Sequence, residues 1–561
     1  MPRAGPVWMR SLIYPNQSST KSCPALMSQK SQGFRPCPKD SSRYGARILS
    51  SFSMKQHLLE RFKVLSEFRV KADLSRIDTY DRFDSVIGIV LVNGVRCMDL
   101  DLGQSARYNF QIAFASKLIN VLRFTGFILE LSNIIQGCPS LGVVSIKSCV
   151  ILQDIDFSSQ TLTEIEFDNC DVSSIKINAP NLHSFSYGGI YTALNPKPCL
   201  IDVSQCKNIA YMKLTNVVDG HWIKNLVNGL SNLKTLILVR CQNIKRIKVW
   251  NEKLERFEVV DCPVLASIEL SAKSLKSFRY TGVNYVCDIS FIASKLIKDL
   301  SIEGLGISDQ WLESQIAKLH CLETLRLKGC NFLTNIKVLH DTLQILELHR
   351  CLNLVEADID TPQLITFEYH GKLIKFWKMV SGGDCAATLD MESWGRYNDD
   401  QFYRWRDLLS YFGYFKPLKI CTFQKQVMMI PERLRDNLVQ PLYDLQHLDI
   451  QIGTLNEIDT DLVDSLLWLS PLPSTIHISS GSHFQMIIEF AYCDMIEREE
   501  DKNLICCIDK LIKCWRHSLK TVKIRSNDVF SESDLMKLKK YFTTSAKLED
   551  SCCFSTGLDR G

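Results

Sequence analysis

The sequence lacks the motifs that mark the common classes of enzyme. It contains no G-x-S-x-G nucleophile motif, no G-x-x-x-x-G-K-[ST] loop, no H-E-x-x-H motif and no G-x-G-x-x-G motif. The 11 histidines are scattered along the chain, and we interpret them as surface or turn residues. The acidic run Glu497–Asp501 is interpreted as a solvated loop or helix start. We therefore expect no enzyme, no cofactor and no metal ion.

Long apolar runs and a strong net charge are also missing. The longest apolar stretch, near Val86–Val92, is far too short to cross a membrane. The net charge of +4 on 561 residues is too small to indicate binding to nucleic acid or to a membrane surface. An apolar content of 46% and a charged content of 23% are ordinary for a folded chain. The expected partner is therefore another protein.

Residues 1–53 contain a single acidic residue, Asp40, and show no apolar periodicity. Serine, proline, arginine and lysine recur there, which is typical of a disordered basic tail. An organelle transit peptide is the alternative, because such peptides are also rich in Arg and Ser and poor in acids. A secretory signal is not expected, since the start has no sustained apolar segment.

One phrase is repeated three times between Leu322 and Tyr369. The copies read L-x-x-L-x-L or a close variant and begin at Leu322, Leu343 and Leu364, 21 residues apart. The two residues of each L-x-L point to the same face of a short strand, because strand side chains alternate. This is the leucine-rich-repeat pattern. A single unit cannot bury its apolar face alone, so the units stack into a solenoid.

Weaker copies lie about half a period after the main ones. They alternate Ile and Val with polar residues and leave too few residues for a helix, which favours extended chain. We therefore predict an α/β fold: a leucine-rich-repeat solenoid, or horseshoe, with a parallel concave sheet and a convex face of mixed helix and extended chain. The weaker copies begin at Val172, Ile244, Leu265 and Leu333, and helices are predicted at Phe127–Gln136, His221–Leu230, Ser308–Leu319, Asp399–Tyr411 and Ser531–Ala546.

The regularity of the repeats predicts the organisation of the chain. The disordered tail of residues 1–53 precedes a solenoid over 54–376, whose first helix caps the open end. An irregular linker with a helix follows over 377–414. Residues 415–561 form irregular C-terminal repeats and a closing helix.

Cysteine is abundant, with 22 residues, and many of these occupy the last position of a repeat strand. A small polarisable side chain fills the bend beneath the strand. We expect buried, reduced thiols in a cytoplasmic or nuclear protein. A metal-binding ladder is the alternative, although no Cys-x-x-Cys pair supports it. The repeat cysteines are Cys149, Cys170, Cys241, Cys262, Cys330 and Cys351.

The polar positions between the leucines predict a binding face. Repeat proteins bind partners on the concave strand surface because it is rigid and extended. An early group is acidic and a late group is mixed and more basic, which favours partners of complementary charge. The predicted binding residues are Glu164, Glu166, Asp168, Arg326, Lys328, Glu347, His349, Glu368 and His370.

Three features together resemble plant F-box/leucine-rich-repeat proteins over about residues 55–530. They are the cysteine-terminated repeats, the phrase Val92-Asn-Gly-Val95 leading into Asp99–Leu102, and the phrase Cys514–Lys520. The resemblance implies a substrate-recognition subunit of a Skp–cullin–F-box ubiquitin ligase. In that family the F-box holds the Skp adaptor, and the solenoid holds the target protein.

Residues 1–53 contain none of the F-box phrases of that family, so the resemblance covers the receptor half. We therefore predict that the chain as written does not bind the Skp adaptor detectably. The alternative function is a leucine-rich-repeat binding module that lacks an F-box and is not part of a ligase.

Overall fold

The computed structural model describes most of the chain beyond residue 66. The described ranges are 67–71, 87–88, 90–92, 94–103, 108–109, 116–151, 154–190, 198–220, 222–282, 287–304, 306–383, 385–392, 398–435, 438–455, 460–481, 484–492, 515–526 and 532–546. The predicted tail and capping helix lie outside them. The chain forms two compact units, Met1–Ser274 and Leu275–Gly561. The domain boundaries expected from the sequence, at residues 53, 376 and 414, stay predictions.

In the first unit, the main strand of each successive coil joins a long parallel sheet. Neighbouring strands pair without a gap in the order β1, β2, β4, β6, β9, β11, β13, β14, β16. Their bounds are Glu67–Lys71, Cys97–Asp101, Val121–Thr125, Val143–Lys147, Glu164–Cys170, Ser184–Gly189, Tyr211–Thr215, Thr235–Val239 and Arg256–Val260.

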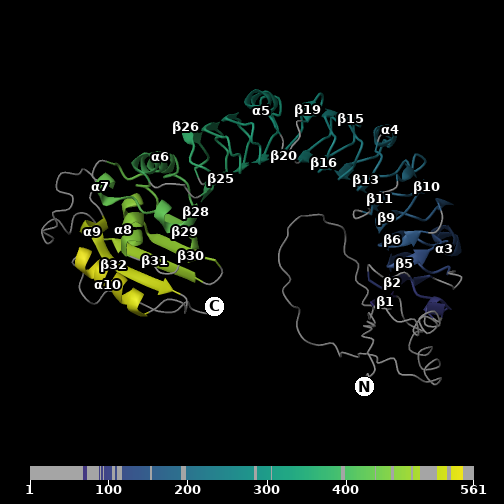
Figure 1. The fold of residues 1–561 in the computed structure, drawn as a ribbon, viewed down its shortest axis with the longest axis horizontal. Coiled ribbons are helices and arrows are strands. Elements are labelled where there is room, and N and C mark those ends of the chain that lie inside the picture. The colour runs from purple at the N-terminus through teal and green to yellow at the C-terminus, as the bar shows by residue number, and fades with distance from the viewer. Residues whose placement is uncertain are drawn as a thin grey trace, which may run out of the picture. The chain divides into compact units, whose positions relative to one another are not determined.

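Short elements form the other side of these coils (Figure 1). The strands are β3 Tyr108–Asn109, β5 Phe127–Leu129, β7 Val150–Ile151, β8 Ile155–Ser158, β10 Ser174–Asn178, β12 Leu200–Asp202, β15 Arg246–Trp250 and β17 Ser267–Ser271, and the helices are α3 Leu131–Gly137 and α4 Ile223–Gly229.

The main strands of the second unit pair in the same parallel way. Its parallel strands are β18 Ser277–Thr281, β20 Asp299–Glu303, β21 Thr324–Lys328, β23 Ile345–His349, β25 Thr366–Gly371, β27 Ala386–Met391, β28 Leu418–Gln424, β29 His447–Thr454 and β30 Thr475–Ser480. The short strands opposite are β19 Asp288–Phe291, β22 Asn335–Leu339, β24 Glu356–Asp360 and β26 Lys375–Val380, with helices α5 Asp309–Ile316 and α6 Asp399–Ser410 on the same side (Figure 1).

The core of each coil consists of the apolar residues at the repeat positions, most often leucine. Leu325 and Leu327 of β21 are buried, whereas Arg326 between them is half-buried. In the sheet register, Leu325 lies beside Leu346 of the next strand, so apolar side chains form continuous ladders from coil to coil. Burying a leucine contributes about 1.5–3 kcal/mol, and only stacked neighbours can provide that burial. The leucine-rich-repeat solenoid predicted from the sequence is confirmed.

The bend after each main strand is built in a common way. The residue before the cysteine adopts a positive φ, and the thiol beneath it contacts backbone carbonyls. Cys170 Sγ, for example, donates to the carbonyl oxygen of Ile146 in the preceding coil at 3.3 Å. All six repeat cysteines are buried and free of disulfides. The positive-φ residues are Ser148, Asn169, Arg240, Asp261, Gly329 and Arg350, with φ of 49°, 54°, 50°, 51°, 62° and 52°.

The predicted outer elements are largely present. All four weaker repeat copies form strands, namely β10, β15, β17 and β22. Helix α5 begins after Ser308, whose hydroxyl caps the helix by accepting from the Trp311 amide at 3.2 Å. The helix expected over Phe127–Gln136 was partly wrong, because Phe127–Leu129 pairs with β7 as strand β5 and the helix starts only at Leu131.

The parallel pairing of the second unit ends at β30. Strand β31, Phe484–Tyr492, runs antiparallel to β30, and β32, Leu519–Ser526, runs antiparallel to β31. The repeat phrase at Leu519 gave no sign of this reversal. The remaining helices are η2 Lys425–Val427, α7 Glu432–Arg435, α8 Thr460–Leu469, α9 Trp515–Ser518 and α10 Glu532–Ala546. Among the described residues, no helix is both long and apolar enough to span a membrane.

An ion-pair cluster joins the last three helices. Asp464 of α8 accepts hydrogen bonds from Arg435, from Arg516 of α9 and from Tyr541 of α10. Arg516 also lies over the ring of buried Trp515, 4.9 Å from its centroid. Trp515 and Arg516, which belong to the phrase Cys514–Lys520 of the family resemblance, therefore pack among these closing helices.

Candidate binding surface

The predicted binding residues all lie at outward positions of long-sheet strands. Three of them are on β9 in the first unit, and six are on β21, β23 and β25 in the second. Because strand side chains alternate, residues flanking the buried leucines point to the opposite face from the core. Each of the nine is exposed or half-buried. Their role in binding stays a prediction.

The early group is centred on Glu166. Its carboxylate accepts a hydrogen bond from the Ser145 hydroxyl at 2.7 Å and faces the Lys147 ammonium at 3.1 Å, both on the neighbouring strand β6. Glu164 and Asp168 lie on the same strand and are exposed. Lys147 thus offsets part of the acidic charge expected from the sequence.

In the late group, Arg326 connects three neighbouring strands. Its guanidinium donates to Asp299 of β20 and to Glu347 of β23, each at 2.8 Å. Lys328, two residues further along β21, lies 2.5 Å from the Glu303 carboxylate. Both cations therefore have anionic partners on the sheet itself. A binding partner would meet these pairs as parts of a fixed network.

Two histidines continue this network. His349 Nε2 lies 3.5 Å from the Glu368 carboxylate, and His370 Nδ1 lies 3.1 Å from Asp390 on β27. The two imidazole rings are neighbours, with centroids 6.2 Å apart. All four side chains are accessible, with exposed fractions between 25% and 44%. Solvent and partner groups can therefore reach them.

Sequence reasoning missed three acidic members of this surface. All three occupy outward positions: Glu303 and Asp390 are in register with Lys328 and His370, and Asp299 accepts a hydrogen bond from Arg326. The repeat phrases beginning at Ile297 and Ala386 carried that signal, because the same phase places these acids beside Arg326, Lys328 and His370. The complete set, called the β20–β27 surface below, is Asp299, Glu303, Arg326, Lys328, Glu347, His349, Glu368, His370 and Asp390.

The added acids change the charge of the late group. The β20–β27 surface holds five carboxylates and two permanent cations, so acidic charge prevails while the histidines are neutral. The six residues predicted from the sequence are balanced, with two permanent cations and two glutamates, and it is the three added acids that make the whole surface acidic.

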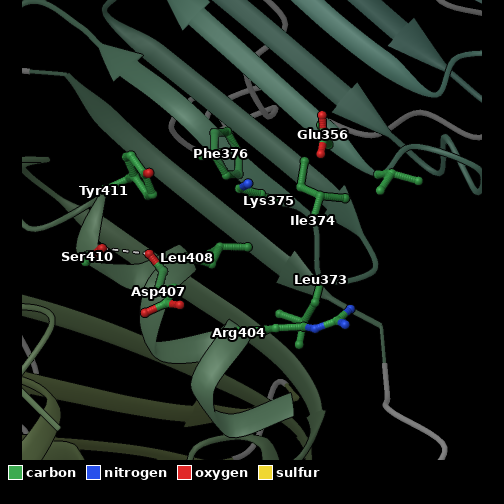
Figure 2. A pocket seen from close by; sticks show the side chains of 11 residues that line it. Glu356, Leu373, Ile374, Lys375, Phe376, Arg404, Asp407, Leu408, Ser410 and Tyr411 are labelled. Carbon is green, nitrogen blue, oxygen red and sulfur yellow. Dashed lines mark hydrogen bonds between the residues drawn. The ribbon is translucent and has the colours of Figure 1, made fainter. Parts of the chain in front are cut away.

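A cavity of about 510 Å³ lies on the opposite side of the same unit, between β26 and α6 (Figure 2). Its floor includes Phe376, which packs edge-on against Phe412 with ring centroids 5.6 Å apart. Arg404 and Asp407 of α6 line its other wall. Lys375 lies 3.2 Å from the centroid of the Trp377 ring. This mixture of apolar and oppositely charged groups does not indicate one class of ligand.

The fold and its exposed strand face define a leucine-rich-repeat protein, a scaffold for protein interaction. Residues 190–304 and 287–478 match the family model of the leucine-rich-repeat domain of At1g61320/AtMIF1. Together these segments cover slightly more than half of the chain. The chain therefore belongs to the At1g61320/AtMIF1 leucine-rich-repeat domain family. The matched region includes the whole β20–β27 surface.

Other comparisons are more distant. No curated protein matches the sequence. Among solved structures, an internalin (InlF) from Listeria monocytogenes is similar, with 13% identity and a TM-score of 0.26. The similarity covers 54% of this chain and 82% of the internalin chain.

Proposed function

We propose that this chain recognises a target protein through the β20–β27 surface, as the receptor half of an F-box/leucine-rich-repeat type of ubiquitin ligase subunit. The observation that carries target recognition is the acidic network on an extended parallel sheet. Its carboxylates lie at outward positions on four of five neighbouring strands, and β21 between them carries the two permanent cations. A rigid, preorganised face of this kind binds without a large ordering cost.

The charge of the surface points to a basic segment as the recognised part of the target. Glu368 and Asp390 face only histidines in the ion pairs described above, so their charge is not offset by a permanent cation there. Complementary charges at an interface speed association and exclude partners of the wrong sign. The ligase role rests on the family resemblance of the sequence, and it is tested separately.

Charge reversal tests the binding surface. We expect Glu368→Lys and Asp390→Lys to reduce, by tenfold or more, the recovery of basic proteins that co-purify with the full chain, as measured by quantitative mass spectrometry. The matched control is Asp358→Lys on β24, which places the same change on the opposite side of the solenoid. Unchanged recovery with both surface variants would refute binding at this face, provided that their circular dichroism matches the unaltered protein.

Co-purification of the Skp adaptor tests the ligase role. The full chain and a shorter chain that begins at Met54 are each purified in the presence of the adaptor. Recovery with the full chain alone supports a ligase subunit whose adaptor contact involves residues 1–53. Absence of the adaptor from both preparations is the result we expect from residues 1–53, and it would mean that this chain recognises its target without contacting the adaptor itself, as in the alternative function of a leucine-rich-repeat module outside a ligase.

A further inference from the structure

We propose that Glu347, His349 and Glu368 bind a zinc ion on the β20–β27 surface, with His370 supplying the fourth side chain. Strands β23 and β25 carry the same Glu-x-His phrase at the same position, and the sheet register pairs glutamate with glutamate and histidine with histidine. Residues two apart on a strand share a face, and adjacent strands are about 4.8 Å apart. Four side chains that can ligate a metal therefore occupy adjacent positions on the two strands.

The distances between three of these groups suit a single ion. The ligand atoms of Glu347, His349 and Glu368 all lie within 4.8 Å of one another. Ligands about 2.0–2.1 Å from a tetrahedral zinc ion lie about 3.3 Å apart. The separation of 3.5 Å between His349 Nε2 and Glu368 is already close to that spacing. Glu347 needs a movement of roughly 1–2 Å at its tip, which side-chain rotation can supply.

Neighbouring residues hold two of the ligands in place. Asp390 faces Nδ1 of His370 at 3.1 Å, which leaves Nε2 as the ligating atom. Imidazoles that bind metals usually donate their other N–H to a carboxylate in this way, because the bond fixes the tautomer. Arg326 donates to one oxygen of Glu347 and leaves the second oxygen for the ion. Asp390 and Arg326 are thus positioning residues for the site.

The ligand set selects the class of metal. Two imidazoles and two carboxylates suit zinc, whereas calcium and magnesium prefer ligands that are all oxygen. Thiolate does not contribute, because buried Cys351 donates to the carbonyl oxygens of Leu327 and His349 beneath the strand. The two carboxylates bring a charge of −2, which a divalent ion neutralises. This site would exist whether or not the chain acts in a ligase.

Titration calorimetry of the purified full chain with zinc chloride tests the proposal. We expect one zinc ion per chain, with affinity reduced at least 100-fold by His349→Gln or Glu368→Gln. Loss of an outer partner of a metal ligand typically reduces affinity about 10–100-fold, so Asp390→Asn should give an intermediate result. His477→Gln is the matched control, because His477 also faces an aspartate, Asp449, at 3.1 Å but has no second Glu-x-His strand beside it.

Cobalt provides a second readout that separates this site from the cysteines. Co²⁺ bound by nitrogen and oxygen gives visible d–d absorption without the intense thiolate-to-cobalt band in the near ultraviolet. We expect this spectrum in the unaltered chain and in His477→Gln, and its loss in His349→Gln. The proposal is overturned if zinc does not bind, if the His349 and Glu368 variants bind as tightly as the unaltered chain, or if a thiolate band accompanies binding.

Discussion

Replacing Gly304 by alanine should destabilise the solenoid far more than the same change at Gly329. Both glycines follow the last residue of neighbouring strands, β20 and β21, and both have a positive φ, of 70° and 62°. They differ in the space beside them. A Cβ on Gly304 would overlap the Gly282 carbonyl oxygen, whereas the nearest atom to a Cβ on Gly329 is the Gly304 nitrogen at 3.7 Å.

The expected magnitudes follow from these two contributions. The left-handed conformation costs an alanine about 1–2 kcal/mol, and both variants bear this cost. Forcing a methyl group into occupied space adds about 1–3 kcal/mol, and only Gly304→Ala bears that addition. The conformational cost alone is tolerated elsewhere in the chain. The equivalent position in other coils holds Ser148, Asn169, Arg240, Asp261 and Arg350, all with φ near 50°.

Urea unfolding of the full chain, followed by far-ultraviolet circular dichroism, measures the difference. We expect Gly329→Ala to lower the free energy of unfolding by about 1–2 kcal/mol and Gly304→Ala by about 2–5 kcal/mol. Gly329→Asn should lower the free energy of unfolding by less than Gly329→Ala does, because asparagine adopts positive φ more readily. Equal losses for the two alanine variants would refute the close approach of Gly304 to the neighbouring coil.

Three further measurements test the fold. Leu325→Ala should lower the free energy of unfolding by about 3 kcal/mol and Arg326→Ala by less than about 1 kcal/mol, because only the leucine is fully buried. Comparable urea midpoints for the two variants would contradict this register. Asp464→Asn should lower the free energy of unfolding, measured by calorimetry, by about 2–3 kcal/mol, because Arg435 and Arg516 lose their common anion. An unchanged melting temperature would contradict that role of Asp464. Burial raises the pKa of Cys170 from about 9 to about 12, so the stabilisation it confers is complete below pH 9 and should be lost as the pH rises toward 12. The urea midpoint should fall less over that pH range in Cys170→Ala than in the unaltered chain. Identical slopes of urea midpoint against pH for the two proteins would contradict this role of the Cys170 thiol.

The repeated phrase predicted the core because burial and sequence period are tied together. Leu325 and Leu346 occupy the same position of successive copies, and each can be buried only by its neighbour in the next coil. The period therefore determined both the strand positions and the parallel register. The helix cap at Ser308 was predictable for a local reason, since a serine hydroxyl satisfies an amide of the first turn.

Other features depend on contacts that the repeat phrase does not encode. Strand β32 has the same phrase as the parallel strands, yet it pairs antiparallel with β31. Phe127–Leu129 is extended because it pairs with β7, a contact that competes with local helical pattern. Arg240 and Arg350 adopt the left-handed (αL) conformation, which arginine does not favour, so the residue type could not predict it. In each case a neighbouring coil, rather than the local sequence, decides the conformation.

Only the orientation of the residues on the candidate surface could be predicted from the sequence, because their neighbours are set by contacts between coils. A residue's phase within the repeat tells whether it points outward, so Glu347 and His370 could be placed on one face from the sequence. Their chemical meaning depends on which residues lie beside them across strands. Asp390 is 20 residues from His370 in the chain but 3.1 Å from its ring, and Asp299 is brought to Arg326 in the same way.

Buried and outward positions of a coil are under different constraints, and this difference explains why function should be sought in the outward positions. Leucine at the buried positions is held by packing, because a change there leaves a cavity that neighbouring coils cannot fill. The outward residue between two leucines has no such constraint, and its charge can vary from Glu166 to Arg326 without altering the strand. A pair of identical Glu-x-His phrases on adjacent strands is therefore not required by the fold. It needs another reason, and metal binding is the one that its geometry supports.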